Sequence, residues 1–478
     1  MFHLFTIIQT TNIIGFSNSI KFFIFAPSML KEYLPYYKRN LKVALPVMIT
    51  QAGQVLVQLA DNIMIGHLGA AQLAGISFAN AILVIGLVFS IGFSQGITPI
   101  VGQAFGKGDS AFVSKAFFNS LFLNLFMLIA TLAVMFFIGF NLDMFGQDAE
   151  VLFYAREYYI ILVWSFIPMV IFNSIRFFSE GIGNTKYAMW ITLFSNGLNI
   201  FLNWVLIYGK LGAPQMGVTG GAWATFISRI VAAVLFFILL FKVEEYNKYL
   251  KFISSKIISL KMVKEQLRLS IPISLQSTLE VTAFSLAAIM VGWLGKYELA
   301  AHQVAQSLST FTFLIATGIG AAATIRVSHQ YGSGNFHETE MAGKASVHIA
   351  VAFMSFCGIL FIAFKSLLPF AFTEDPNVIP IAEDLIVILA LFQIFDATQL
   401  ASLSSLRGLK DIKIPLLFSL IAYYLICLPV AYLLGFKAGL GPTGVWIGLA
   451  AGLAIAAITF YLRFLSICKK MNPHKNEI

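Results

Sequence analysis

The sequence contains one long pattern twice, and this duplication limits the possible folds more than any other feature. Residues 45–109 and 271–335 align without a gap at a constant offset of 226, and a second block aligns at an offset of 227. The matched pairs include Pro46 with Pro272, Gly66 with Gly292, Gly92 with Gly318, Gly106 with Gly332, Gly181 with Gly408, and Lys186 with Lys413. A tandem repeat of about half an apolar chain is typical of membrane transporters.

The composition places the chain in a membrane. Hydrophobic residues make up 59% of the sequence and charged residues only 11%, whereas charged residues form about a quarter of a soluble protein. A membrane-spanning helix needs about 20 predominantly apolar residues. The sequence predicts an all-α membrane protein with twelve transmembrane helices, at residues 41–67, 75–101, 113–139, 151–178, 187–208, 218–241, 268–292, 299–325, 343–370, 380–403, 414–435 and 441–465.

The twelve predicted spans divide evenly around a polar linker. Because six spans precede the linker, the second copy enters the membrane from the same side as the first. We therefore expect two pseudo-symmetric six-helix lobes, related by an axis along the membrane normal and facing each other across a cleft. The predicted parts are an N-terminal extension (1–40), an N-terminal lobe (41–241), a cytoplasmic linker (242–267), a C-terminal lobe (268–465) and a cytoplasmic tail (466–478).

Basic residues set the expected orientation. They concentrate in one set of connections, which includes Lys38, Arg39, Lys107, Arg176, Lys242, Lys248, Lys251, Lys256, Lys261, Lys264, Arg326, Arg407, Lys410 and Lys469. Lys and Arg mark the cytoplasmic side, so both termini and the linker are expected there. The net charge of +9 is then a topology signal, and nucleic acid is not an expected partner.

The first 28 residues fit the pattern of the twelve spans poorly, and a secretory signal is not expected. They are rich in Phe and Ile but are interrupted by Gln9, Thr10, Thr11 and Asn12, with no early basic region and no cleavage site. Met29 opens a short basic segment that runs into the first span. We expect translation to begin at Met29, with an additional surface helix or span as the alternative.

Three acidic residues lie well inside predicted spans: Asp61, Glu280 and Asp396. A charge at the centre of a membrane helix costs about 2.5 to 3.5 kcal/mol, so three would cost roughly 8 to 10 kcal/mol, comparable to the stability of a whole protein. A protonated carboxyl that bonds a neighbouring helix is one way to offset this cost. A site that binds a cation or a proton is the other.

The duplication separates these two interpretations, because it does not reproduce the acidic residues. In the other copy, Asp61 aligns with Ala287, Glu280 with Gln54, and Asp396 with Met169. A packing requirement of the shared fold should appear in both halves. Charges confined to one copy indicate site chemistry, with two carboxylates in the second half and one in the first.

The fifth predicted span adds polar groups to the first half. Asn199 and Asn203 are four residues apart, so their amides project from one helix face, and Asn196 lies one turn earlier. Such amides can merely bridge helices. Together with Asp61 they can instead complete a proton or cation site in the N-terminal lobe.

Several segments resemble one family, the multidrug and toxic compound extrusion (MATE) family in its NorM branch. The resemblance rests on residues 45–66, 92–106 and 199–209, on Glu280 after Pro272, on 300–303 and on Asp396, and it covers about residues 30 to 470. It implies a multi-pass transporter of the bacterial inner membrane, a monomer without cofactor, that exports hydrophobic and mostly cationic compounds in exchange for Na+ or H+. By this resemblance Glu280 and Asp396 bind the coupling cation, with Na+ as the possible metal, while Asp61, Asn199 and Asn203 form the N-terminal site.

The sequence departs from the family pattern at Phe392, one turn before Asp396. Some sodium-coupled relatives resemble this region but place a tyrosine there. A phenyl ring has no oxygen to offer an ion, so the choice between Na+ and H+ stays open. Aromatic side chains such as Trp164, Phe177 or Tyr423 could hold a cationic substrate in the cleft.

Rival functions require features that differ from those of this chain. A primary pump needs a nucleotide site, and the sequence contains no GxxxxGK[ST]. An intramembrane enzyme needs a cluster of carboxylates or histidines at a loop or interface, whereas the seven histidines are scattered. A flippase for lipid-linked sugars needs cationic residues in its cleft, and Arg229 is the exception among mainly acidic embedded groups. The flippase and the enzyme remain the alternatives.

Two nearby carboxylates also predict a mechanism. In a low dielectric they repel, so without a cation at least one should hold a proton. Binding Na+ or H+ would neutralise the pair and favour the lobe arrangement that releases the drug, while the lobes rock about the cleft.

Overall fold

The computed structural model describes residues 27–66, 68–251 and 258–471. The predicted start at Met29 falls in the first helix, and residues 1–26 of the predicted N-terminal extension lie outside the described residues. Within these ranges every regular element is helical. Twelve helical segments are long and apolar enough to cross a membrane, and each contains or overlaps one of the twelve predicted spans. The predicted fold class is confirmed.

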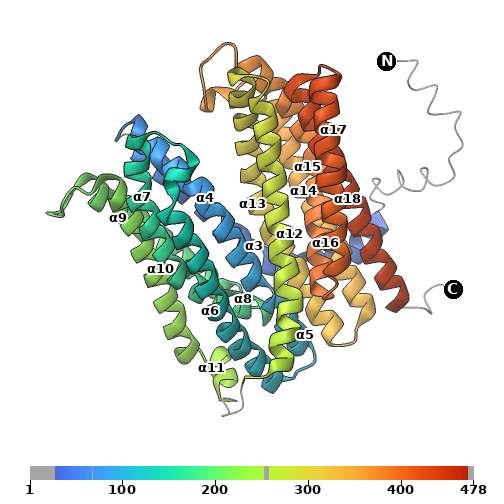
Figure 1. Cartoon of the computed structure of the whole chain (residues 1–478). Helices are drawn as coiled ribbons and strands as arrows, with labels where there is room; N and C mark the ends of the chain where they lie inside the picture. The colour runs from blue at the N-terminus through green and yellow to red at the C-terminus, as the bar shows by residue number, and fades with distance from the viewer. Residues whose placement is uncertain (1–26, 67, 252–257, 472–478) are drawn as a thin grey trace, which may run out of the picture.

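Six spans form each lobe (Figure 1). The N-terminal lobe contains α3 (Pro27–Gly66), α4 (Ala70–Gln95) with α5 (Ile97–Gly106), α6 (Ser110–Phe140), α7 (Ala149–Trp164) with α8 (Phe166–Gly181), α9 (Lys186–Tyr208) and α10 (Gly217–Lys242). The C-terminal lobe contains α12 (Leu260–Gly292), α13 (Lys296–Gly332), α14 (Phe336–Ala363), α15 (Ile379–Gly408), α16 (Lys413–Leu420) with α17 (Leu428–Tyr432), and α18 (Gly441–Met471). Short 3-10 turns lie at Leu142–Phe145 and Leu368–Ala371.

The repeat reproduces helix caps as well as helices. Asp109 accepts a hydrogen bond from the Phe112 backbone N–H at 2.9 Å and starts α6. Its repeat mate Asn335 caps α14 in the same way at 3.1 Å. Short polar side chains at this position satisfy free N–H groups of the first helical turn. The two halves therefore begin equivalent helices with equivalent chemistry.

The repeat offset corresponds to a two-fold relation in space. A Cβ atom at Gly92 would lie 2.9 Å from Cα of Ser274, and one at the mate Gly318 would lie 2.5 Å from the backbone nitrogen of Met48, the mate of Ser274. Gly102 packs directly on its own mate, Ser328. A residue that touches its own mate must lie beside the axis, so the pseudo-two-fold axis passes between α5 and α13.

The lobes approach each other at the end of the molecule that carries the linker and diverge toward the other end (Figure 1). The first helix contributes to both lobes. Its second half packs on α9, while its first part packs on α13 and α14, where Asn40 donates to the Ala342 carbonyl at 2.9 Å and to Ser346 at 2.8 Å. Residues 31–40, which the sequence assigned to an extension, therefore belong to the first helix.

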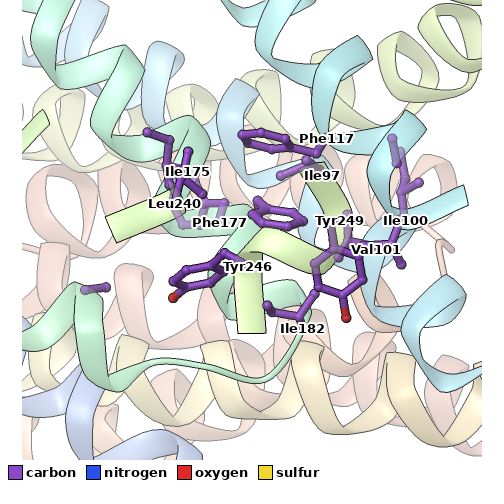
Figure 2. Close-up of a cluster of buried hydrophobic side chains, with 14 of the residues drawn as sticks. Ile97, Ile100, Val101, Phe117, Ile175, Phe177, Ile182, Leu240, Tyr246 and Tyr249 are labelled. Carbon is purple, nitrogen blue, oxygen red and sulfur yellow. The ribbon is translucent and has the colours of Figure 1, made fainter. Parts of the chain in front are cut away.

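Two parts of the predicted linker (242–267) are helical. A short helix, α11 (Glu244–Leu250), follows α10 directly, and α12 begins at Leu260. Tyr246 and Tyr249 insert into a core cluster of the N-terminal lobe (Figure 2), and the Tyr246 hydroxyl lies 2.5 Å from Ser179 Oγ. Burial raises the pKa of the Tyr246 phenol, so it stays protonated. The linker is thus anchored to the N-terminal lobe.

The eleventh span is broken. Two π-helical segments, Ile421–Cys427 and Leu433–Lys437, flank α17. Pro429 lies in the first turn of α17 and lacks the N–H that a continuous α-helix uses. Such wide turns are frequent at functional sites because they re-aim side chains. Here the first segment carries Tyr423.

Candidate functional site

A cavity of about 620 Å³ lies between the lobes. It is lined from α3, α4, α5 and α8 on one side and from α12, α13 and α15 on the other. Its volume is within the usual range for small organic ligands. Its wall is largely apolar, and its principal polar groups are Gln58, Gln95, Glu180, Glu280, Gln303, Gln306, Asp396 and Arg407.

The two acidic residues predicted for the C-terminal lobe both line this cavity. Glu280 on α12 is partly exposed to it, and Asp396 on α15 is 4% exposed. The two carboxyl groups thus share one largely apolar cavity, where like charges repel. Among the described residues, no basic side chain forms an ion pair with either one. The structure thus brings together two carboxylates whose charge a mobile cation could balance.

Tyr423 supplies an oxygen at this site that the sequence did not place there. Its hydroxyl donates to Glu280 Oε1 at 3.0 Å and accepts from the Gln399 amide at 3.1 Å. Tyr423 was predicted as a ring face for a cationic substrate, but it is 1% exposed and does not line the cavity. The broken eleventh span brings its hydroxyl to Glu280 instead.

Of the other aromatic residues that the sequence analysis singled out, Phe392 and Phe177 line the cavity and Trp164 does not. Phe392 lines the cavity and packs edge-on against Phe284, with ring centroids 6.2 Å apart. Phe177 lines the cavity as predicted. Trp164 does not: it is 47% exposed and packs against Phe136 with centroids 5.0 Å apart.

The structure corrects the sequence analysis at Arg407, which was placed in a cytoplasmic connection. It lies in the last turn of α15, partly buried, and lines the cavity. Its Nη2 donates to Gln276 at 3.2 Å, and its Nη1 lies 3.4 Å from Oε1 of Gln95 in the opposite lobe. Arg407 and Glu280 line the same cavity, and Gln276 lies one turn before Glu280 on α12. At the 227 offset Arg407 falls on Glu180, so the repeat places charges of opposite sign at this position.

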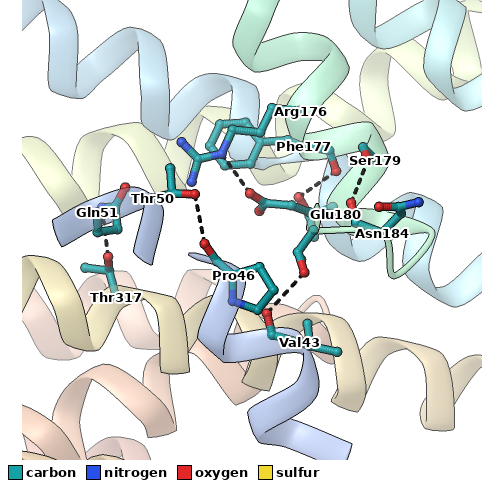
Figure 3. A network of polar contacts seen from close by, with 12 residues as sticks. Val43, Pro46, Thr50, Gln51, Arg176, Phe177, Ser179, Glu180, Asn184 and Thr317 are labelled. Carbon is teal, nitrogen blue, oxygen red and sulfur yellow. Dashed lines mark hydrogen bonds and ion pairs between the residues drawn. The ribbon is translucent and has the colours of Figure 1, made fainter. Parts of the chain in front are cut away.

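Glu180 is a further embedded carboxylate that sequence reasoning missed. It is 2% exposed and forms an ion pair with Arg176 at 2.7 Å, one turn earlier on α8 (Figure 3). Arg176 had also been assigned to a connection. Since its charge is balanced within its own helix, Glu180 differs from Glu280 and Asp396, although all three line the cavity.

The three residues predicted for the N-terminal site do come together. Asn203 donates to Asp61 and, at 3.2 Å, to the side-chain oxygen of Asn199. In the alternative orientation of the Asn199 amide, this second bond is replaced by one from the Asn199 nitrogen to Asp61 Oδ1 at 3.1 Å. Arg229 on α10 is within electrostatic range of Asp61 and donates to Ser165 at 2.6 Å. None of the three predicted residues lines the cavity between the lobes.

A set of contacts joins the lobes below the cavity, and we name it the linker-end contact. The Gln103 amide donates to the Gly408 carbonyl at 3.0 Å, and Nε2 of His329 lies 2.7 Å from the Gly181 carbonyl. Gln103 and His329 are repeat mates, as are the two glycines, so the two bonds are related by the pseudo-two-fold.

Close backbone packing completes the linker-end contact. A Cβ atom at Gly106 would lie 2.1 Å from the His329 carbonyl oxygen, and one at Gly332 would lie 2.1 Å from that of Gln103. Farther along, Gln51 donates to Thr317 across the lobes at 3.0 Å (Figure 3). The cavity is therefore closed toward the linker end in this structure.

The family model MatE matches this chain twice, at residues 46–205 and 272–433, one match in each lobe. The chain belongs to the MatE family. Members of this family are transporters rather than enzymes, and the predicted resemblance is confirmed. The two matches begin at repeat mates, Pro46 and Pro272, so the family model also follows the duplication.

Whole-length relatives carry multidrug resistance names. The "Probable multidrug resistance protein NorM" of Agrobacterium fabrum is 30% identical over 93% of this chain and 97% of its own length. The "Multidrug resistance protein NorM" of Aliivibrio fischeri is 28% identical over 94% of this chain and 98% of its own. Among solved structures, the eukaryotic MATE transporter AtDTX14 superposes with a TM-score of 0.83 at 22% identity, covering 92% of this chain and 99% of that one. The structural likeness concerns the fold.

Proposed function

We propose that this MatE protein exports hydrophobic, mostly cationic compounds across the bacterial inner membrane in exchange for Na+ or H+. The observation that carries the proposal is the carboxylate pair Glu280 and Asp396, which lines a cavity between two lobes without an ion-pair partner among the described residues. The multidrug resistance names of relatives that match over almost their whole length support it.

Glu280 and Asp396 are the proposed cation-coupling residues. Two carboxylates near each other in a low dielectric repel, and either Na+ or H+ relieves this repulsion. Within the described residues no group of three or more His, Cys, Asp or Glu gathers. A bound Na+ would therefore complete its oxygen ligands from neighbouring amides, hydroxyls such as that of Tyr423, and water.

The same cavity is the proposed substrate site. Its apolar wall suits a hydrophobic molecule, and the two carboxylates attract a positive charge. A ring face such as that of Phe177 adds about 0.5 to 2 kcal/mol for each cation–π contact. Drug and cation would then depend on the same negative charge, which is a direct way to make one displace the other.

The arrangement of the lobes supports alternating access as the proposed mechanism. With the linker on the cytoplasmic side, as the basic residues predict, the linker-end contact closes the cavity toward the cytoplasm. The structure then represents the outward-facing arrangement. Export requires a second arrangement in which this contact opens, and coupling requires only that cation and drug favour different arrangements.

The available energy limits the stoichiometry. A tenfold cation gradient supplies about 1.4 kcal/mol, and each net charge that crosses 100 mV supplies about 2.3 kcal/mol. Exchange of one cation for one monovalent drug moves no net charge, so the membrane potential would not drive it. Two carboxylates permit two cations for each drug molecule. One net charge would then cross the membrane in each cycle, so the membrane potential would also drive export.

Drug efflux from proteoliposomes under separately imposed Na+ and H+ gradients tests the proposal. An ethidium-like cation should leave faster under one or both gradients, and Asp384→Asn at the exposed far end of α15 provides a matched control for Asp396→Asn. An efflux rate that is the same with and without either gradient would contradict cation coupling. Movement of a lipid-linked sugar in place of the dye would favour the flippase. A flippase needs several cationic residues in its cleft, whereas Arg407 is the one arginine among the described residues that line the cavity.

A further inference from the structure

Arg407 differs from its repeat mate in a way that the fold does not require. Glu180 occupies the equivalent position in the N-terminal lobe and pairs with Arg176 one turn earlier. The mate of Arg176 is Leu403. Arg407 therefore has no opposite charge at the equivalent position of its own helix, and its Nε atom is buried without a hydrogen-bond partner. Glu280 lines the same cavity, and it lies one turn beyond Gln276 on α12, the residue to which Arg407 donates.

Arg407 also connects the carboxylate pair to the opposite lobe. Its guanidinium contacts Gln95 of the N-terminal lobe at 3.4 Å and Gln276 of its own lobe at 3.2 Å. The next residue, Gly408, accepts the hydrogen bond from Gln103 that forms half of the linker-end contact. One short segment at the end of α15 thus touches the cavity, the carboxylate region and the lobe interface.

We propose that Arg407 is a positioning residue that ties the charge of Glu280 to the linker-end contact. This inference rests on the proposed cation exchange at Glu280 and Asp396. A charged Glu280 attracts the guanidinium and draws it away from Gln95, which weakens the contact between the lobes. A bound cation cancels that attraction and leaves Arg407 bridging Gln95 and Gln276, as in this structure.

A second consequence concerns cation affinity. Arg407 is a fixed internal cation that competes with the transported one for Glu280. Removing its charge in Arg407→Gln should lower the cation concentration for half-maximal efflux by about tenfold or more, because opposite charges attract strongly in a partly desolvated site. Arg407→Lys keeps the charge and should stay within about threefold of the wild type.

A double-mutant cycle tests the coupling without knowledge of the transported cation. Spin labels at Lys107 and Ser333, an exposed pair of repeat mates at the linker end, report the distance between the lobes. The native residues Cys357, Cys427 and Cys468 are first replaced by Ala. In alkaline choline buffer, which contains neither Na+ nor appreciable H+, Glu280→Gln should increase the closed population, and it should have no such effect in the Arg407→Gln background.

The controls separate this proposal from a structural role and from failure of the proposed function. Arg463→Gln removes an arginine that pairs with Asp411 away from the cavity and should leave the cycle unchanged. Gln95→Leu should reduce the closed population while Glu280 remains intact. If Arg407→Gln does not fold, Arg407→Lys with Gln95→Leu still tests the bridge.

An equal effect of Glu280→Gln with and without Arg407 would overturn the inference. So would an unchanged cation requirement in Arg407→Gln. If instead Glu280→Gln itself leaves gradient-driven efflux intact, the proposed function fails first, and the two failures are distinguishable.

Discussion

The two lobes share one fold but differ in the way they treat embedded acidic groups. In the N-terminal lobe, Asp61 is bonded by Asn203, lies within range of Arg229, and does not line the cavity. In the C-terminal lobe, Glu280 and Asp396 line the cavity, although Glu280 also accepts a hydrogen bond from Tyr423. Duplication thus fixed the positions of the helices, while later substitutions gave each copy its own chemistry.

Repeat mates show where the shared fold permits no divergence. Gly106 and Gly332 are both required because each lies against the backbone of the opposite lobe. Gln103 and His329 differ in type, yet both lie within hydrogen-bond distance of a carbonyl at the same place. Glu180 and Arg407 line the cavity with opposite charges. The interface constrains geometry, and the cavity wall is free to change charge.

The largest effect is expected from the carboxylate pair. Glu280→Gln and Asp396→Asn should each insert and fold normally, because the amide has the same shape and removes an embedded charge. Each should abolish the response of efflux to both cation gradients. Efflux assays under each gradient measure this response, with Asp384→Asn as the control. If a variant expresses normally and its efflux still responds to the gradients, its carboxyl group serves only to hold neighbouring helices together.

The next largest effect is expected from the paired glycines. Gly106→Ala and Gly332→Ala each place a methyl carbon against a carbonyl oxygen, so the linker-end contact should open and efflux should fall about tenfold, a shift of about 1.4 kcal/mol between arrangements. Gly197→Ala on α9 is the control, because nothing lies within 4 Å of its added carbon. Label distances between Lys107 and Ser333 that match the wild type would contradict close packing as the cause.

A smaller and separable effect is expected from the N-terminal site. Asp61→Asn should slow efflux but leave its dependence on the cation gradients unchanged, because this carboxylate is bonded by Asn203 and does not line the cavity. The initial rate should be measured at several gradients. Loss of the gradient response in Asp61→Asn would move cation coupling, wholly or in part, to the N-terminal lobe.

The smallest effect is expected at the linker-end hydrogen bonds. His329→Ala removes one bond, worth about 1 kcal/mol, and should change the ratio of closed to open lobes by about fivefold. His329→Gln restores the amide found at its mate Gln103 and should behave nearly as the wild type. Equal disruption by both variants would show that ring packing on Phe105, with centroids 4.8 Å apart, matters more than the bond.

The fold was predictable because apolar runs of membrane length and an ungapped repeat are both visible in one sequence. Asp61, Glu280 and Asp396 were identifiable because a carboxylate inside a span is costly. Arg407 and Glu180 were not, because they lie in the last turns of their helices, where a charge costs little and resembles a loop residue. Tyr423 was misassigned because its direction depends on the π-helical break, which the hydrophobic pattern does not encode.

The comparison of the lobes is tested most directly by making the same substitution in each. Asp61→Asn and Asp396→Asn are introduced separately into the protein labelled at Lys107 and Ser333, and the distance between the labels is measured in proteoliposomes while Na+ or H+ is varied. We predict that Asp61→Asn retains the cation-driven change in distance and that Asp396→Asn loses it. A response that survives in Asp396→Asn and disappears in Asp61→Asn would contradict the assignment of cation coupling to the C-terminal lobe.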